Sequence, residues 1–386
     1  MIPRHLAPKI LAWTTQYPVV TITGPRQSGK TTLCKALFPH KPYVSLEDMA
    51  TRNQVREDPR GFLARYPEGA ILDEIQRAPD LPSYLQGIVD ERNVPGMFIL
   101  TGSQQFELMA GVSQSLAGRT AIARLLPFSY AELYAAGTPP ALDAMLYAGF
   151  YPRIHDMRLD PSEALAFYVS TYVERDIRQI VNIRDFGKFE SFIKLLAGRS
   201  GQLLNLNSLG SDCGLSHGTM SSWVSALEQG GLLYIMRPYS GNLGKRLLKT
   251  PKLYLLDTGL LCYLLGIYSA NQLSTHPLRG HIFESFAVAE FLKIQYNHGF
   301  PGTLLFYRDQ KGEEVDLVAE SASGRLLCEI KSSATWNPEY SKAVDRLAAI
   351  MPGPTRKAVI LGNTDHPYIH MDLSLVGYPY IDSLVS

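Results

Sequence analysis

The chain has 386 residues, of which 46% are apolar and 19% are charged, and its formal net charge is +1. This length favours two or three domains, with enough apolar residues to give each a core. The near-zero net charge excludes a general attraction to nucleic acid, so any such contact has to come from a local patch of basic residues.

The first residues and the most apolar stretch of the second half predict no membrane partner. Residues 1–6 lack the apolar core of a signal peptide, and the most apolar stretch of the second half, 253–267, is interrupted by Asp257. The four cysteines are scattered, which argues against a disulfide framework and against a zinc site. We therefore expect a cytoplasmic protein.

The segment Gly-Pro-Arg-Gln-Ser-Gly-Lys-Thr at 24–31 lies between an apolar run at 19–23 and a segment with helical spacing at 32–38. A glycine-rich loop between a strand and a helix is typical of a phosphate-binding loop. Lys30 would contact the β- and γ-phosphates of a nucleotide, and the hydroxyl of Thr31 would bind Mg²⁺. The residues expected to contact the nucleotide are Gly24, Gln27, Ser28, Gly29, Lys30, Thr31 and Thr32.

A second apolar run, at 69–72, ends in two carboxylates, Asp73 and Glu74. Asp73 would hold Mg²⁺ directly or through water, and Glu74 would orient and polarise the attacking water. A third apolar run, at 96–100, leads to several polar residues. We favour Ser103 as the group that helps to hold the water; Thr101 and Gln104 are alternatives that the sequence does not separate.

Two arginines downstream are candidates for a group that neutralises charge on the γ-phosphate. Arg119 is the stronger candidate and Arg124 the weaker. Such an arginine acts either within its own chain or across a subunit boundary, which would require a homo-oligomer. The alternative is a surface arginine paired with a carboxylate.

The chain pattern predicts an α/β protein with four parts: a P-loop ATPase core at 1–126, a helical lid at 127–187, a winged helix-turn-helix at 188–254 and an α/β nuclease-like domain at 255–386. The first part alternates apolar strands with helical segments, and the second is mostly helical. Such lids often move against the core with nucleotide state.

The third part has the spacing of two short helices around Gly214, followed by two strands that flank a glycine-containing loop. In winged helices the second helix enters the major groove of DNA. The alternative is a plain domain-packing module. The basic residues that would contact DNA phosphates, without reading the base sequence, are Lys245, Arg246, Lys249 and Lys252.

The fourth part carries a second candidate chemistry in Glu284 on an apolar-periodic helix, Asp316 on one expected strand, and Glu329 with Lys331 on the next. These are the parts of a PD-(D/E)xK nuclease core. In that core, two carboxylates hold a divalent metal and the lysine positions water. Asp316 and Glu329 would hold that second metal ion. The alternatives are a set of solvated ion pairs, or a nuclease-like fold that does not cleave.

The Asp73-Glu74 pair and the polar strand end resemble the additional-strand ATPases of the AAA type. The whole chain resembles a prokaryotic family of AAA-type ATPases whose carboxy-terminal domain has no known function. The resemblance rests on the 24–31 loop, Asp73-Glu74, Leu-Ala-Gly-Arg119, Glu314-Val-Asp316 and Glu329-Ile-Lys331. It implies binding of ATP and Mg²⁺ and hydrolysis of ATP.

Three hypotheses about function follow. The first is a Mg²⁺-dependent ATPase that acts on or with DNA through its winged helix and nuclease-like region. The second is a nucleotide-gated, metal-dependent DNA nuclease. The third is a regulatory switch that turns ATP over slowly and acts on protein partners.

Overall fold

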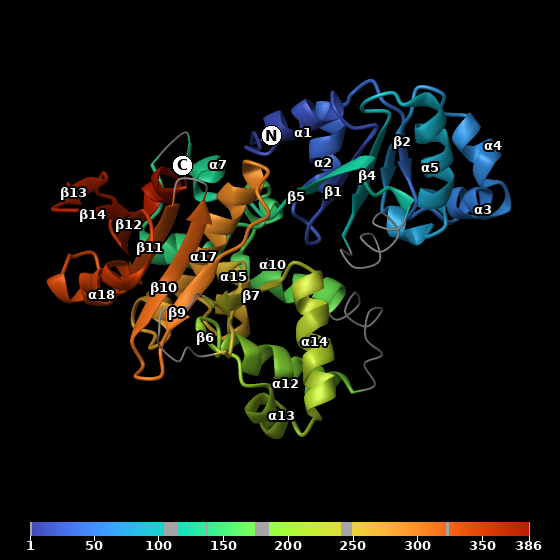
Figure 1. Cartoon of the computed structure of the whole chain (residues 1–386). Coiled ribbons are helices and arrows are strands. Elements are labelled where there is room, and N and C mark those ends of the chain that lie inside the picture. The colour runs from blue at the N-terminus through green and yellow to red at the C-terminus, as the bar shows by residue number, and fades with distance from the viewer. Residues whose placement is uncertain are drawn as a thin grey trace. The chain divides into compact units, whose positions relative to one another are not determined.

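The structure is a computed structural model that describes residues 2–103, 115–135, 138–173, 185–240, 249–321 and 324–385. The chain divides into two compact units. The first comprises residues 1–128 with the short segments 229–231 and 296–300, and the second comprises the remaining residues. Figure 1 shows the elements of each.

The first unit is built on a sheet of five parallel strands in the order β2-β3-β4-β1-β5. The strands are β1 (Val19–Thr23), β2 (Tyr43–Ser45), β3 (Ile71–Asp73), β4 (Phe98–Gly102) and β5 (Thr120–Arg124). The helices are α1 (Ala7–Thr14), α2 (Lys30–Leu37), α3 (Met49–Glu57), α4 (Pro59–Ala64) and α5 (Leu81–Arg92), with a 3₁₀ turn at Ile75–Arg77.

Successive residues of β1 point to opposite faces of this sheet, and both faces are covered. Val19 belongs to one buried apolar cluster, and Val20 belongs to the other. A parallel sheet needs such cover because its strands are apolar on both sides. Strand β4 lies between β1 and β3, so the carboxyl ends of these three strands meet at one edge of the sheet. The parallel sheet predicted for 1–126 is confirmed.

The second unit contains a sheet of nine strands in the order β13-β14-β12-β11-β10-β9-β7-β8-β6. The strands are β6 (Gln202–Leu203), β7 (Leu233–Pro238), β8 (Lys252–Leu255), β9 (Leu305–Arg308), β10 (Glu314–Ser321), β11 (Gly324–Lys331), β12 (Thr355–Leu361), β13 (Tyr368–His370) and β14 (Leu373–Gly377). The antiparallel hairpin β7–β8 joins the rest through a parallel pairing of β7 with β9.

The helices of the second unit fall into three groups along the chain. The first group is α7 (Tyr130–Tyr134), α8 (Leu142–Ala148), α9 (Pro152–Asp156) and α10 (Pro161–Tyr168), continued by a wider helical turn at Val169–Val173. The second is α12 (Phe186–Ala197), α13 (Leu206–Cys213) and α14 (His217–Gln229). The third is α15 (Thr258–Leu264), α16 (Ala270–Ser274), α17 (Arg279–Asn297) and α18 (Lys342–Ile350), with 3₁₀ turns at Pro338–Ser341 and Tyr378–Leu384.

The helices expected to form a lid pack within this second unit. The Phe150 amide donates to Asp257 Oδ2 at 2.7 Å, and Asp257 also caps α15 by accepting from the Leu260 amide at 2.8 Å. One buried carboxylate thus links residues 149–150 to the start of α15. The boundary near residue 127 is close to the division between the units, but the four-part division stays a prediction.

Among the described residues, no helix has both the length and the apolar character that crossing a membrane requires. All four cysteines are free and buried.

Candidate functional site

The loop between β1 and α2 has a backbone that only certain residues can adopt. Gly24, Gln27 and Gly29 have φ values of 147°, 60° and 93°, and Gly29 is the residue that precedes the helix. A Cβ atom on Gly24 would lie 2.0 Å from the Leu125 carbonyl oxygen, so any other residue there would push the loop away from the sheet. The glycine requirement inferred from the sequence thus has a steric cause at this position.

Lys30 and Ser28 place polar groups inside this loop. Lys30 is 6% exposed, and its Nζ donates to the Gly24 and Pro25 carbonyl oxygens, both at 2.9 Å. Burial lowers the pKa of Lys30, while the Glu74 and Asp73 carboxylates oppose that shift. The Ser28 hydroxyl is fully buried and has no hydrogen-bond partner among the described residues. Phosphate oxygens accept hydrogen bonds from groups of both kinds.

Asp73, at the carboxyl end of β3, is buried and collects three hydroxyl donors. Its Oδ2 accepts from Thr31 at 2.9 Å and from Tyr43 at 2.6 Å, and its Oδ1 accepts from Thr101. A threonine hydroxyl beside a carboxylate is a set of hard oxygen ligands, which suits Mg²⁺ shared with nucleotide phosphates and water. The residues present therefore fit the ion that the phosphate loop implies.

Glu74 follows Asp73 with a left-handed backbone (φ 57°), which is uncommon for a residue with a side chain. Its Oε2 accepts from Ser103 at 3.1 Å and from the Gln76 amide nitrogen. The structure thus places Ser103 on Glu74 and Thr101 on Asp73, a division that the sequence did not separate. Gln104 lies outside the described residues.

Two residues of this site were not found from the sequence. Tyr43 starts β2, and it reaches Asp73 because β2 and β3 are neighbours in the sheet. Its ring also lies under the Lys35 ammonium, with Nζ 3.7 Å from the ring centroid. Gln76, two residues after Glu74, could have been suspected from its place beside the acidic pair.

Arg119 lies at the amino ends of the parallel strands, whereas the phosphate loop lies at their carboxyl ends. It immediately precedes β5, which runs parallel to β1 with Val19 opposite Thr120 and Thr23 opposite Arg124. The loop leaves the other end of β1, and five residues of strand span roughly 16 Å. Arg119 instead pairs with Asp90 of α5, donating from Nη2 to Oδ2 at 2.8 Å. The geometry contradicts a contact of Arg119 with the loop of its own chain.

Arg124, the weaker candidate, lies at the same edge as the phosphate loop but is engaged elsewhere. Its guanidinium donates to the Tyr296 hydroxyl at 3.2 Å and lies 5.5 Å from the centroid of that ring.

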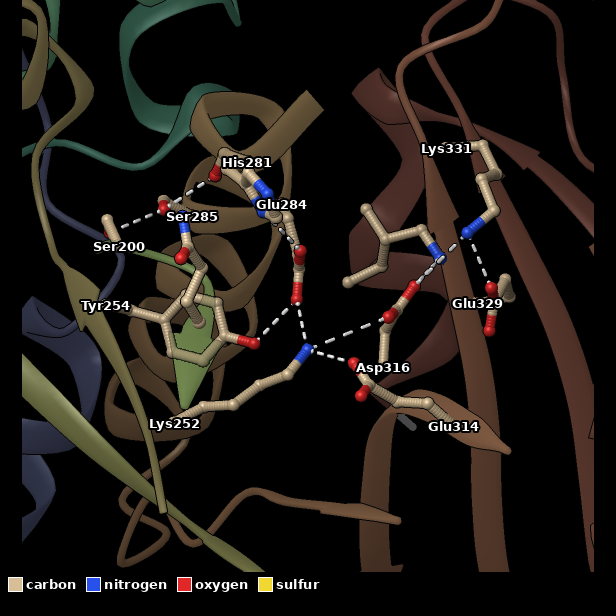
Figure 2. A network of polar contacts seen from close by, with 12 residues as sticks. Ser200, Lys252, Tyr254, His281, Glu284, Ser285, Glu314, Asp316, Glu329 and Lys331 are labelled. Atoms are coloured by element: carbon tan, nitrogen blue, oxygen red, sulfur yellow. Dashed lines mark hydrogen bonds and ion pairs between the residues drawn. The ribbon is translucent and has the colours of Figure 1, made fainter. Parts of the chain in front are cut away.

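The second candidate constellation does come together in the second unit (Figure 2). The buried Glu284 of α17, Asp316 of β10 and Glu329 of β11 lie in one acidic cluster with the half-buried Glu314 of β10 and Lys331 of β11. Lys331 Nζ donates to Glu329 Oε1 at 2.5 Å and lies 3.8 Å from Asp316 Oδ2. Asp316 Oδ2 also accepts from the Ile330 amide at 2.9 Å. Sequence reasoning placed Glu284, Asp316, Glu329 and Lys331 in this site. Glu314 was noted only in the family resemblance, and two residues on β8 are exceptions.

Those exceptions are Lys252 and Tyr254, which both bind Glu284 Oε1. Lys252 Nζ lies 2.9 Å from that oxygen, and the Tyr254 hydroxyl donates to it at 2.6 Å. Lys252 was expected among the basic residues that face DNA, but it is 3% exposed and its ammonium contacts carboxylates, so that expectation is wrong. Lys249 is exposed, as a phosphate contact requires, whereas Lys245 and Arg246 lie outside the described residues.

The carboxylates of the acidic cluster have pKa values shifted in opposite directions. Burial raises the pKa of Glu284, but Lys252, His281 and Tyr254 more than offset this and hold it at about 2. Burial raises the pKa of Asp316 well above its usual range, and the neighbouring Glu329 and Glu284 carboxylates add to the shift. Glu284 is thus the member whose charged form is matched by donors, and Asp316 is the one whose charge is poorly compensated.

The second divalent metal ion expected at Asp316 and Glu329 finds no support in the structure. In the described part of the chain, no three His, Cys, Asp or Glu side chains are arranged to hold a metal. Asp316 already accepts from a backbone amide, and one oxygen of Glu329 is bound by Lys331.

Comparison with known proteins agrees with the architecture of the first unit. Residues 16–134 match a family model described as an AAA domain, and residues 140–271 and 279–380 match two domains of unknown function, DUF8612 and DUF4143. The uncharacterized protein Rv2008c of Mycobacterium tuberculosis is 30% identical over 350 residues, which cover 88% of this chain and 77% of that protein. The uncharacterized protein Mb2031c of Mycobacterium bovis matches to the same extent.

Among solved structures, the Walker-type ATPase PABY2304 of Pyrococcus abyssi is 13% identical, with a TM-score of 0.46 over 68% of this chain and 96% of that one.

Proposed function

The chain belongs to the same family as the uncharacterized mycobacterial protein Rv2008c, with an AAA domain at its amino-terminal side, and we propose that it is a Mg²⁺-dependent ATPase that acts on or with DNA. The observation that carries the ATPase part is the convergence of Lys30, Asp73 and Glu74 at the carboxyl edge of one parallel sheet, each held by polar neighbours.

The residues of this site would have separate roles in ATP hydrolysis. Lys30 would exchange its two carbonyl partners for phosphate oxygens and so offset the negative charge that the reaction redistributes. Thr31 and Asp73 would hold Mg²⁺, which supplies charge neutralisation on the β- and γ-phosphates. Glu74 would accept a hydrogen bond from the attacking water and orient it, with Ser103 and Gln76 fixing the carboxylate.

Tyr43 is proposed to set the position of Asp73. In Tyr43→Phe, Asp73 Oδ2 keeps only the Thr31 donor, so the carboxylate is less firmly oriented toward the ion. A hydrogen bond to a charged group contributes about 1.5–3 kcal/mol, so we expect roughly a tenfold rise in the Mg²⁺ concentration for half-maximal ATP turnover. Tyr84→Phe, on the exposed side of α5, is the control. An unchanged Mg²⁺ dependence in Tyr43→Phe would refute the role.

Arg119 is proposed to act on the site of a neighbouring subunit, because its own phosphate loop is at the far edge of the sheet. Inactive Lys30→Ala chains, which keep Arg119, are expected to restore part of the turnover of Arg119→Ala chains when the two are mixed. Mixing Lys30→Ala with Glu74→Gln is the control, because both of these defects lie in the same site. If the first mixture turns ATP over no faster than the sum of its two variants measured separately, action across subunits is contradicted.

The DNA part of the proposal is supported by the region from α12 to β8. Helices α13 and α14 flank Gly214, whose left-handed conformation ends α13, and β6 pairs with the β7–β8 hairpin. This order of helices and strands supports the predicted winged helix. The second helix, α14, buries Met220, Trp223 and Leu227, and leaves the polar residues His217, Ser221 and Ser222 exposed.

ATP turnover with and without duplex, branched and single-stranded DNA tests this proposal. DNA-stimulated turnover that weakens steeply with salt is expected, because phosphate contacts release counterions. Turnover that is slow and indifferent to every nucleic acid would favour the regulatory switch acting on proteins. The nuclease alternative requires that Asp316→Ala or Lys331→Ala abolish strand cleavage while leaving ATP turnover intact.

A further inference from the structure

Lys252 is an unexpected member of the acidic cluster, because its ammonium lies among three carboxylates at the centre of Figure 2. Nζ is 2.9 Å from Glu284 Oε1 and 3.9 Å from Asp316 Oδ1, and it also contacts Glu314 Oε1. These carboxylates come from α17 and β10, whereas Lys252 comes from the first residue of β8. The cluster thus receives one of its cations from the hairpin region of the chain, in addition to Lys331 of β11.

We infer that the Lys252 ammonium is the permanent cation of this acidic cluster, so that the carboxy-terminal domain holds no divalent metal there and does not cleave phosphodiester bonds. The inference goes beyond the proposed ATPase function and does not depend on it.

Most of the oxygen atoms that a metal would need already have partners. Glu284 Oε1 accepts from both Lys252 and Tyr254, and Glu284 Oε2 lies 3.6 Å from His281 Nδ1. Glu314 is shared between Lys252 and Arg308, whose Nη1 lies 2.8 Å from Oε2. Two oxygen atoms of the cluster have no hydrogen bond among the described residues: Glu329 Oε2 is buried without a partner, and Asp316 Oδ1 has only the Lys252 ammonium at 3.9 Å. A divalent cation bound at these two oxygens would have to displace the Lys252 ammonium from Asp316 and take most of its six or more ligands from water.

Electrostatic repulsion also disfavours a divalent ion in the acidic cluster. A buried ammonium is costly unless opposite charges surround it, and three carboxylates do so here. A divalent ion that shared Glu284 or Asp316 would lie close to the ammonium, and repulsion between cations is strong at a buried site. The backbone of Lys252 is also fixed, because this residue pairs with Met236 of β7 and Leu203 of β6.

The consequence for chemistry follows from the role of the metal. In metal-dependent cleavage the ion activates water and stabilises the charge on the leaving oxygen. An ammonium held by three carboxylates has little remaining charge to offer a phosphate. The acidic cluster instead links β8 to α17 and β10, and the Ser200–Ser285 hydroxyl contact at 2.9 Å adds a second link to α17.

Binding of Mn²⁺ alone to the nucleotide-free full chain tests the inference, with bound ions counted by electron paramagnetic resonance. Wild type and Asp316→Asn are expected to bind the same number of ions. Lys252→Met is expected to gain one ion per chain, which Lys252→Met/Asp316→Asn loses again. Lys252→Arg, which keeps the charge, should not gain an ion.

Two outcomes would overturn the inference. One is the loss of a bound Mn²⁺ from wild type on Asp316→Asn substitution, a comparison that stays valid even if the Lys252→Met chain fails to fold. The other is Mn²⁺-dependent nicking of supercoiled DNA by wild type that disappears in Asp316→Asn. Neither readout involves ATP, so failure here is distinguishable from failure of the ATPase proposal.

Discussion

ATP turnover is expected to fall by about two to four powers of ten in both Lys30→Ala and Glu74→Gln, the range typical of a lost charge-stabilising group or general base. The two variants should differ in binding. Lys30→Ala removes the ammonium that would contact the phosphates, so its affinity for ATP should also drop. Glu74→Gln keeps the loop intact and should still bind ATP. Single-turnover kinetics and nucleotide-binding titrations separate these effects.

The controls for this experiment lie on neighbouring surfaces. Arg56→Ala removes an exposed cation and Glu57→Gln neutralises an exposed carboxylate, both on α3. Both controls should turn ATP over at close to the wild-type rate. Wild-type turnover in Lys30→Ala or Glu74→Gln would show that the carboxyl edge of the sheet is not a hydrolytic site.

The second large effect concerns stability. Lys252→Met removes the ammonium from the acidic cluster and leaves the buried Glu284 and Asp316 and the half-buried Glu314 without it. Breaking a buried ion pair from one side costs roughly 3–5 kcal/mol, and we expect a loss of that size in the free energy of unfolding of the second unit. Urea denaturation followed by tryptophan fluorescence measures it, because Trp223 and Trp336 both lie in that unit.

Lys249→Met is the matched control, since it removes an exposed lysine three residues earlier and should change stability by less than about 0.5 kcal/mol. Adding Glu284→Gln to Lys252→Met should recover part of the loss, because one fewer buried charge is then left unpaired. Equal stability of wild type and Lys252→Met would mean that the ammonium is not an integral part of the acidic cluster.

The sequence was sufficient where function depends on residues that are close in the chain. The loop at 24–31 and the Asp73-Glu74 pair each sit at the end of one strand, so their roles follow from local pattern. The sequence was insufficient to place Lys252, which was grouped with the other basic residues near a loop that were expected to contact DNA. Alternation along β8 puts Lys252 and Tyr254 on one face, but only the pairing of strands brings that face to Glu284 on α17.

Arg119 illustrates a different limit. Its motif suggested an arginine near the nucleotide, and the motif carries no information about which end of the sheet it occupies. The parallel register of β1 and β5 supplies that information. Tyr43 was missed because nothing in its local sequence distinguishes it from an ordinary strand residue, and its contact with Asp73 arises from the order of strands.

The parallel pairing of β7 with β9 has a practical consequence for dissecting the protein. A fragment that ends after β8 would expose the edge of β7 to solvent, and one that begins at α17 would expose the edge of β9. Open strand edges recruit other chains and promote aggregation. The first fragment would also keep Lys252 without its carboxylate partners, and the second would keep those carboxylates without Lys252. The helix–hairpin part and the carboxy-terminal sheet should therefore be expressed, exchanged between relatives and inherited as one piece.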